Sequence, residues 1–136
     1  MIKWFKKLFS GNGEDKRKLV LIVDDDEYIA DLLRMHLESR GFATMRAANG
    51  VDALKRLAER VPDIMLLDIT MPQMSGFEVL QIIREDERLF SLPVLMVTDV
   101  SLIGKVDECY SLGAKGYILK PFELEKVMQK IDSVLV

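Results

Sequence analysis

Four short apolar runs of this sequence each end in side chains that can bind a cation or an oxyanion. These side chains are Asp24, Asp25 and Asp26 after the first run, Asp68 after the second, Thr98 after the third and Lys120 after the fourth. Carboxylate oxygens favour a hard cation, and Mg²⁺ is the usual choice where phosphate chemistry is involved. A hydroxyl and an ammonium group suit a tetrahedral oxyanion. Together these groups would let one aspartate attack a phosphoryl group.

Each of these features has a simpler explanation when it is taken alone. An acidic triplet after a strand often does no more than favour the positive end of the following helix. A lone Lys-Pro pair is usually a surface feature. Their joint placement at successive strand ends is what favours a common site.

The apolar runs that carry these residues predict the strands of a parallel sheet. Ile64–Leu67 is apolar at every position and is flanked by Pro62 and Pro72, which is typical of a strand buried on both faces. In open α/β sheets, ligands bind at the carboxyl ends of the strands. Asp68 therefore falls where a ligand is expected, and its burial requires a metal ion or an opposite charge nearby.

Five predicted strands alternate with five predicted helices, which indicates an α/β doubly wound parallel sheet with right-handed crossovers. The expected strands are 19–23, 42–47, 64–67, 93–97 and 116–119, and the expected helices begin near residues 27, 49, 75, 101 and 123. The second strand carries Thr44 and Arg46, as an edge strand would.

Residues that favour helix ends mark several of these boundaries. Asn49 can cap the second helix, and Ser75-Gly76-Phe77-Glu78 matches a capping box at the start of the third. The fourth helix, expected over Ser101–Leu112 and closed by Gly113, has the poorest helical pattern because Gly104 lies inside it.

The 136 residues suffice for one domain, and we assign residues 18–136 to it and residues 1–17 to an extension and flexible linker. Met1–Phe9 has apolar and aromatic residues on one helical face and three lysines on the other. Such a segment suits an anionic membrane surface or the groove of a protein partner. A frayed terminus is the alternative, because nine residues are too few for a stable isolated helix.

The overall charge of −3 argues against direct binding to nucleic acid. A single cysteine, Cys109, rules out an internal disulfide bond and fits a reducing compartment. Lysines interrupt the N-terminus before a secretory signal could form, and no apolar stretch approaches the ~20 residues of a membrane-spanning helix. We therefore expect a cytoplasmic protein.

Residues 18–136 resemble the receiver domain of bacterial two-component response regulators. The matching motifs are Val23-Asp24-Asp25, Asp68-Ile69-Thr70-Met71-Pro72, Ser75-Gly76, Val97-Thr98 and Gly113-Ala114-Lys115-Gly116-Tyr117-Ile118-Leu119-Lys120-Pro121-Phe122. The single-domain chemotaxis receiver is similar in length and layout. The resemblance implies a five-stranded, flavodoxin-like receiver fold with strand order 2-1-3-4-5, which places the 42–47 strand at an edge.

The resemblance implies that Asp68 is the phosphoacceptor and that a Mg²⁺ ion binds beside it. By the same resemblance, Asp25 is a direct ligand of the ion and Asp24 acts largely through water. Asp68 itself and the backbone carbonyl of Thr70 complete the implied ligand set.

The resemblance also implies groups that contact the phosphoryl oxygens, namely Thr98 and Lys120. Tyr117 matches an aromatic residue that changes rotamer when Thr98 moves and so belongs to the switch. Asp26 lies one place beyond the acidic pair, and we assign it a capping role. The peptide between Lys120 and Pro121 is expected to be cis.

The function implied is that of a stand-alone phosphoacceptor signalling protein rather than an enzyme with a turnover substrate. A histidine kinase or a phosphotransfer protein would supply the phosphoryl group, and phosphorylation and dephosphorylation would be self-catalysed. The fourth helix, fifth strand and fifth helix would form the face that binds a downstream protein.

Asp99 departs from the family pattern, in which a small residue follows the threonine. A carboxylate there would repel a phosphoryl group and compete for Lys120, unless it turns to solvent, which we favour. Two alternatives stay open. One is a receiver-like scaffold that Asp99 leaves poorly phosphorylated. The other is an aspartate-nucleophile phosphohydrolase. Enzymes of that class have a second Asp two places after the nucleophile, where this chain has Thr70.

Overall fold

The structure, a computed structural model, describes residues 15–135 of the chain. The interaction segment predicted at Met1–Phe9 lies outside the described residues. Within them, none of the helices has the length and apolar character needed to span a membrane.

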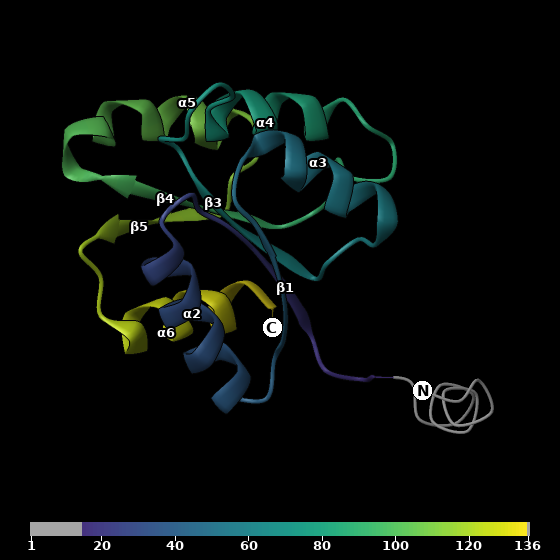
Figure 1. Cartoon of the computed structure of the whole chain (residues 1–136). Helices are drawn as coiled ribbons and strands as arrows, with labels where there is room; N and C mark the ends of the chain where they lie inside the picture. Colours follow the sequence, from purple (N-terminus) through teal and green to yellow (C-terminus); the bar gives the residue numbers. More distant parts are fainter. Residues whose placement is uncertain (1–14, 136) are drawn as a thin grey trace.

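Strands and helices alternate along the described chain, as the sequence predicts (Figure 1). The elements are β1 (Leu19–Val23), α2 (Glu27–Ser39), β2 (Ala43–Ala47), α3 (Gly50–Glu59), β3 (Ile64–Asp68), α4 (Gly76–Arg84), β4 (Val94–Asp99), the 3-10 helix η1 (Val100–Lys105), α5 (Val106–Ser111), β5 (Gly116–Lys120) and α6 (Leu124–Leu135).

The five strands form one parallel sheet in the order β2-β1-β3-β4-β5. The predicted fold class and strand order are therefore confirmed. Strands β1 and β3 are buried along their whole length, because they lie inside the sheet and helices cover both of its faces. β2 lies at an edge, and its central residues are only half-buried, as Thr44 and Arg46 indicated.

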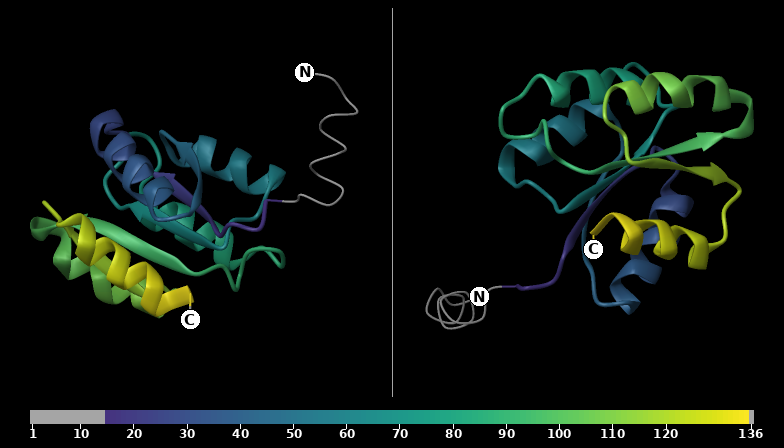
Figure 2. Two further views of the ribbon diagram at one scale, coloured as in Figure 1. Left: turned by 90° about the horizontal axis from the view of Figure 1, so that it is seen from below. Right: turned by 180° about the vertical axis from the view of Figure 1, so that it is seen from behind.

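Alternate residues of each strand enter two separate cores, one on each face of the sheet. Leu21 and Val23 of β1 pack in the core beneath α3, α4 and α5, whereas Val20 and Ile22 pack in the core beneath α2 and α6. The two helical layers are visible in Figure 1, and Figure 2 shows them from below and from behind. Because the strands are parallel, their carboxyl ends meet at one edge of the sheet.

The helix boundaries follow the capping residues in the sequence. Asp26 caps α2 and accepts hydrogen bonds from the amides of Tyr28 and Ile29 at 3.0 and 3.2 Å. Asn49 caps α3, and Ser75 caps α4 through a hydrogen bond of 3.2 Å from the amide of Glu78. These bonds satisfy amides that the first helical turn leaves unpaired.

The predicted helix over Ser101–Leu112 is wrong in its first half. Val100–Lys105 forms a 3-10 helix, and the α-helix begins only at Val106. No residue of η1 is fully buried, and only Leu102 packs against the core, so packing contributes little to hold this segment in an α-helix. Gly104 adds to the effect because glycine weakens helices.

Arg84, the last residue of α4, joins that helix to two loops. Its Nε donates to the carbonyl oxygen of Leu112 at 2.6 Å, and its Nη2 donates to that of Gly113 at 3.2 Å. Its Nη1 donates to the carbonyl oxygens of Leu92 and Phe90 at 2.8 and 3.1 Å. The guanidinium thus fastens the C-terminal end of α5 to α4, whereas η1 at the other end is exposed.

Candidate functional site

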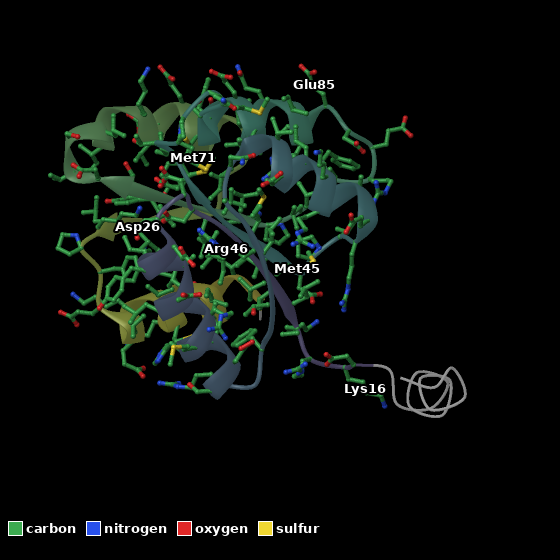
Figure 3. All side chains as sticks on the ribbon, in the orientation of Figure 1. Lys16, Asp26, Met45, Arg46, Met71 and Glu85 are labelled. Atoms are coloured by element: carbon green, nitrogen blue, oxygen red, sulfur yellow. The ribbon has the colours of Figure 1, made fainter. Side chains whose placement is uncertain are left out.

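The candidate residues come together at the carboxyl edge of the sheet. Asp24 and Asp25 directly follow β1, Asp68 ends β3, Thr98 lies near the end of β4, and Lys120 ends β5. In Figure 3 the labelled Asp26 and Met71, from the loops that follow β1 and β3, lie on this side of the molecule. The parallel direction of the strands is what gathers these loops, since every strand ends on the same side.

Three carboxylates form an acidic cluster at this edge. One oxygen from each of Asp24, Asp25 and Asp68 lies within 4.8 Å of the others. Asp24 and Asp68 are 2% and 4% exposed, whereas Asp25 is exposed to solvent. Like charges this close in a buried setting repel one another unless a cation compensates them.

Lys120 supplies part of that compensation. Its Nζ lies 2.9 Å from Oδ2 of Asp24 and 3.2 Å from Oδ2 of Asp68. Although burial acts to lower the pKa of Lys120, its hydrogen bond to Asp24 and the charges of Asp68 and Asp24 raise that pKa above its usual value. One ammonium group against three carboxylates leaves a negative site made of oxygen ligands, which fits a hard divalent cation.

The carboxyl group of Asp68 has a perturbed pKa. Burial is the main cause that raises the pKa of Asp68 to about 6, and the negative charge of Asp24 adds to it. Lys120 and the amide of Thr70 act in the opposite direction. A second positive charge beside Asp68 would therefore favour its ionised form, which is the nucleophilic one.

The loop after Asp68 holds its carboxylate and passes close to its backbone. The amide of Thr70 donates to Oδ1 of Asp68 at 3.1 Å. The amide of Gly76 donates to the carbonyl oxygen of Ile69 at 2.9 Å, and a Cβ atom on Gly76 would lie only 2.1 Å from the carbonyl oxygen of Asp68. Only glycine fits there, which gives the Ser75-Gly76 motif a physical reason that its spacing alone did not reveal.

Thr98 lies beside the cluster but does not join its hydrogen bonds. The residue is fully buried, and its Oγ1 donates to the carbonyl oxygen of Asp99 at 3.0 Å. The strand register places Thr98 close to both Asp68 and Lys120. Its neighbour Val97 pairs with Asp68 of β3, and its other neighbour, Asp99, pairs with Lys120 of β5. A rotation about one bond would free this hydroxyl for another acceptor.

Asp99 turns to solvent, as we favoured. Its Oδ1 accepts a hydrogen bond of 2.9 Å from the amide of Ser101 and caps η1. This bond is the main cause that lowers the pKa of Asp99, and the charge of Lys120 makes a smaller contribution. The side chain therefore stays ionised but is held away from the acidic cluster.

Tyr117 is half-buried on β5 and contacts α6. The Nζ atom of Lys130 lies 5.4 Å from the centre of the Tyr117 ring, a cation–π distance. A pocket of about 360 Å³ lies beside them and includes Phe122 and Lys126 in its wall. The proposed switch residue thus faces the surface that β5 and α6 share.

Arg46 supports the backbone of the acidic cluster, a role that the sequence analysis missed. It was used only as a marker of an edge strand, yet its Nη2 donates to the carbonyl oxygen of Asp24 at 3.2 Å. The contact depends on the register of β1 and β2, in which Ile22 pairs with Arg46. No local signal in the sequence indicates that register.

Comparison with known proteins finds one family over nearly the whole described chain. The family model described as "Response regulator receiver domain" matches residues 20–132. The polar-differentiation response regulator DivK of Brucella anthropi is 36% identical over 118 residues, which cover 87% of this chain and 96% of DivK. The DNA-binding dual master transcriptional regulator RpaA of Synechocystis sp. is 34% identical over 116 residues, which cover 85% of this chain and 48% of RpaA. The chain thus spans about half the length of RpaA.

Solved structures show the same architecture. The chemotaxis protein CheY4 of Vibrio cholerae has a TM-score of 0.83 at 31% sequence identity, over 88% of this chain and 99% of that chain. A putative response regulator from Chloroflexus aurantiacus also has a TM-score of 0.83 at 31% identity, over 88% of this chain and 98% of that one.

Proposed function

Because the chain belongs to the response regulator receiver domain family, we propose that Asp68 accepts a phosphoryl group from a histidine kinase or a phosphotransfer protein. The observation that carries this proposal is the contact of Asp68 with Lys120 inside the acidic cluster. In the transfer, a carboxylate oxygen of Asp68 attacks phosphorus, and the bond from phosphorus to the donor's imidazole nitrogen breaks. The imidazole leaves with the electron pair of that bond.

We assign a Mg²⁺ ion to the acidic cluster. Asp24, Asp25 and Asp68 would hold it, with the backbone carbonyl of Thr70 as a further ligand. The donor set supports this assignment, since it consists of oxygen atoms and carries more negative charge than Lys120 balances. When bound, the ion supplies charge neutralisation for the phosphoryl oxygens.

The remaining residues position Asp68 and receive the phosphoryl group. The amide of Thr70 fixes Oδ1 of Asp68, and Lys120 sits on the side of Oδ2. During transfer, Lys120 moves its hydrogen bond to a phosphoryl oxygen as negative charge develops there. The hydroxyl of Thr98 rotates away from the carbonyl oxygen of Asp99 and donates to a second phosphoryl oxygen. Two interactions thus follow the negative charge as it moves from the donor to Asp68, while the amide of Thr70 keeps the carboxylate in place.

The phosphorylated state then changes the face formed by η1, α5, β5 and α6. The movement of Thr98 alters the space beside Tyr117, and the exposed η1 can rearrange because no buried residue restrains it. A downstream protein would bind or leave at this face. We place the protein in two-component signalling in the bacterial cytoplasm, with Met1–Phe9 as a contact to an anionic membrane surface or to a protein.

The position of Asp99 bears on the scaffold alternative. Its carboxylate is exposed and bound to the amide of Ser101, so it leaves Lys120 available to Asp24 and Asp68. We therefore favour a protein that is phosphorylated over one that Asp99 blocks. A phosphohydrolase, the second alternative, would turn over generic phosphate esters, which a release assay for inorganic phosphate would detect.

Treatment with acetyl phosphate tests the proposal. The intact mass of the wild-type chain should increase by one phosphoryl group when Mg²⁺ is present and not when a chelator removes it. Asp68→Asn should show no increase, and Asp132→Asn, an exposed carboxylate on α6, should behave as the wild type. Equal labelling of Asp68→Asn and the wild type would refute the assignment.

A further inference from the structure

Met1–Phe9, which precedes the residues that the structure describes, combines an apolar face with a basic one. Apart from Lys3, Lys6 and Lys7, every residue of the segment is apolar. On a helical wheel the apolar residues occupy one half, and the three lysines occupy the other. Trp, Phe and Leu side chains can enter the boundary between headgroups and acyl chains, while lysines on the opposite face meet anionic headgroups. The pattern therefore suits a lipid surface that carries negative charge.

The apolar face is wider than the stripe that a helix presents to the groove of a protein. Helices that bind in grooves use anchors spaced three or four residues apart. Here two pairs of large apolar residues are adjacent in the sequence, Trp4-Phe5 and Leu8-Phe9. Adjacent residues lie well apart around a helix, so the pairs broaden the apolar face. A flat boundary between lipid and water accommodates such a face across its whole width, and the pattern thus favours a membrane.

Positive charge is concentrated at the start of the chain, and the rest of the chain is negative. Residues 1–18 hold six Lys or Arg and two acidic residues, which gives a net charge of +4. Since the whole chain has a net charge of −3, residues 19–136 carry −7. An anionic membrane attracts the first part and repels the second. Such a surface would therefore also orient the domain.

The structure places the start of the domain at the edge of the sheet that lies opposite the acidic cluster. Lys16 and Lys18 are exposed immediately before β1, and Figure 3 shows the labelled Lys16 at the other end of the molecule from the labelled Asp26. The amide of Leu19 donates to Oδ2 of Asp63 at 2.7 Å, and the amide of Asp63 donates to the carbonyl oxygen of Leu19 at 2.9 Å. These two bonds fix the direction from which the chain enters β1.

Two arginines add positive charge at this entry point. Arg17 forms an ion pair with Asp15 at 2.7 Å. Its hydrogen bonds to Asp15 are the main cause that lowers the pKa of that carboxyl group, and the charge of Arg60 makes a smaller contribution. Arg60, exposed after α3, therefore lies near the same point. We call Lys16, Arg17, Lys18 and Arg60 the basic junction.

We propose that Met1–Phe9 binds an anionic lipid membrane and that the basic junction holds the amino edge of the sheet toward the lipid. The membrane would supply the apolar surface that a helix of nine residues needs to be stable. Asp68 and the acidic cluster would then face away from the membrane, because β1 and β3 run from the amino edge toward them. This assignment narrows the contact that the proposed function gives to the segment, and it does not depend on phosphorylation of Asp68.

The fluorescence of Trp4 tests the proposal, because Trp4 is the single tryptophan of the chain. Vesicles made of equal parts of phosphatidylcholine and phosphatidylglycerol should shift the Trp4 emission of the full chain to shorter wavelength. Vesicles of phosphatidylcholine alone should bind far more weakly. Replacement of all three lysines of the segment by Gln should weaken binding to the anionic vesicles at least about tenfold, since each lysine near such a surface contributes about fivefold. Asp68→Asn should bind as the wild type does, which separates this test from that of phosphorylation.

Two further variants test the amphipathic pattern and the basic junction. Lys7→Leu combined with Leu8→Lys keeps the composition and the charge but places a lysine on the apolar face, so it should weaken binding at least about tenfold. Lys16→Gln combined with Lys18→Gln should weaken it by about fivefold or more. Lys55→Gln, an exposed position on α3, is the matched control and should leave the affinity unchanged.

The vesicle titration also contains the results that would overturn the proposal. No shift of the Trp4 emission with anionic vesicles, or equal affinity for the two kinds of vesicle, would overturn the choice of an anionic membrane. Wild-type affinity of the variant that exchanges Lys7 and Leu8 would overturn the amphipathic pattern. An emission that is already at short wavelength without lipid, and that vesicles leave unchanged, would show that the segment docks on protein instead. Equal loss of affinity in Lys55→Gln and in the variant of Lys16 and Lys18 would overturn the role of the basic junction.

Discussion

At Asp68, burial and the neighbouring charge of Asp24 favour the protonated carboxyl group when no cation is bound. The pKa of about 6 in the folded chain lies above the value of about 3.9 for an unfolded aspartate. A carboxyl group with a raised folded-state pKa contributes most stability below pH ~4 and loses that contribution as the pH rises through about 6. The ionised carboxylate of Asp68 therefore destabilises the fold by itself, and a cation bound at the acidic cluster would compensate its charge.

This titration predicts how Asp68→Asn changes the stability of the metal-free protein. The substitution should raise the melting temperature more at pH 7.5 than at pH 5, because the wild type bears the full cost of the ionised carboxylate only at the higher pH and a part of that cost at pH 5. Thermal unfolding at the two pH values measures the difference, with the exposed Asp132→Asn as the matched control. An equal gain at both pH values would contradict the raised pKa.

Asp99 should slow phosphorylation only slightly. Its charge lies near enough to Lys120 to interact with it, yet the side chain is exposed, and solvent screens such interactions. Asp99→Ala should therefore accelerate labelling by acetyl phosphate by less than about fivefold. Asp99→Asn separates charge from capping, since its amide oxygen can still accept from Ser101. The same rate in both variants and the wild type would show that the charge has no influence.

At the scale of elements, the start of α4 lies so close to the end of β3 that Gly76 has no room for a side chain. Gly76→Ala should destabilise the fold by about 1–3 kcal/mol, because the added methyl group would overlap the carbonyl of Asp68. Gly104→Ala is the matched control, since nothing lies within 4 Å of its added Cβ and the change should be neutral or stabilising. Chemical denaturation compares them, and a Gly76→Ala as stable as Gly104→Ala would disprove the close approach.

Arg84 should matter more to stability than any neighbouring cation. Removal of its guanidinium in Arg84→Met takes the donor from five carbonyl oxygens, those of Leu112, Leu89 and Leu92 in part-buried bonds, so we expect a loss of more than about 2 kcal/mol in the free energy of unfolding. Arg88→Met, which removes one bond to the carbonyl oxygen of Leu57, should cost less. Faster hydrogen exchange at Gly113 in Arg84→Met would locate the damage, and a loss no larger than that of Arg88→Met would contradict the role.

The elements that the sequence predicted are those whose signals are local. Apolar runs, capping side chains such as Asp26 and Asn49, and strand ends gave the sheet, the helix starts and the residues of the acidic cluster. The failure at η1 has a physical cause, because an α-helix there depends on burial that the sequence around Gly104 does not reveal. Arg84 and Arg46 were missed since their acceptors lie far away in the chain and are set by packing and register.

For the molecule as a whole, the parallel sheet separates two surfaces. The acidic cluster lies at the carboxyl edge, and the face of η1, α5, β5 and α6 lies at the side of the sheet that β5 forms. Leu19 begins β1 at the opposite edge from Asp68, so the chain that precedes it enters away from the acidic cluster. An attachment through that end would leave the acidic cluster accessible to a kinase.

A crystal structure with Mn²⁺ and beryllium trifluoride, a phosphoryl mimic, measures the central assignment most directly. We predict an anomalous peak bound by Asp25, Asp68 and the carbonyl of Thr70, and an adduct on Asp68 that Lys120 and Thr98 contact. An acidic cluster without metal at millimolar Mn²⁺, or an adduct on any other carboxylate, would contradict the account.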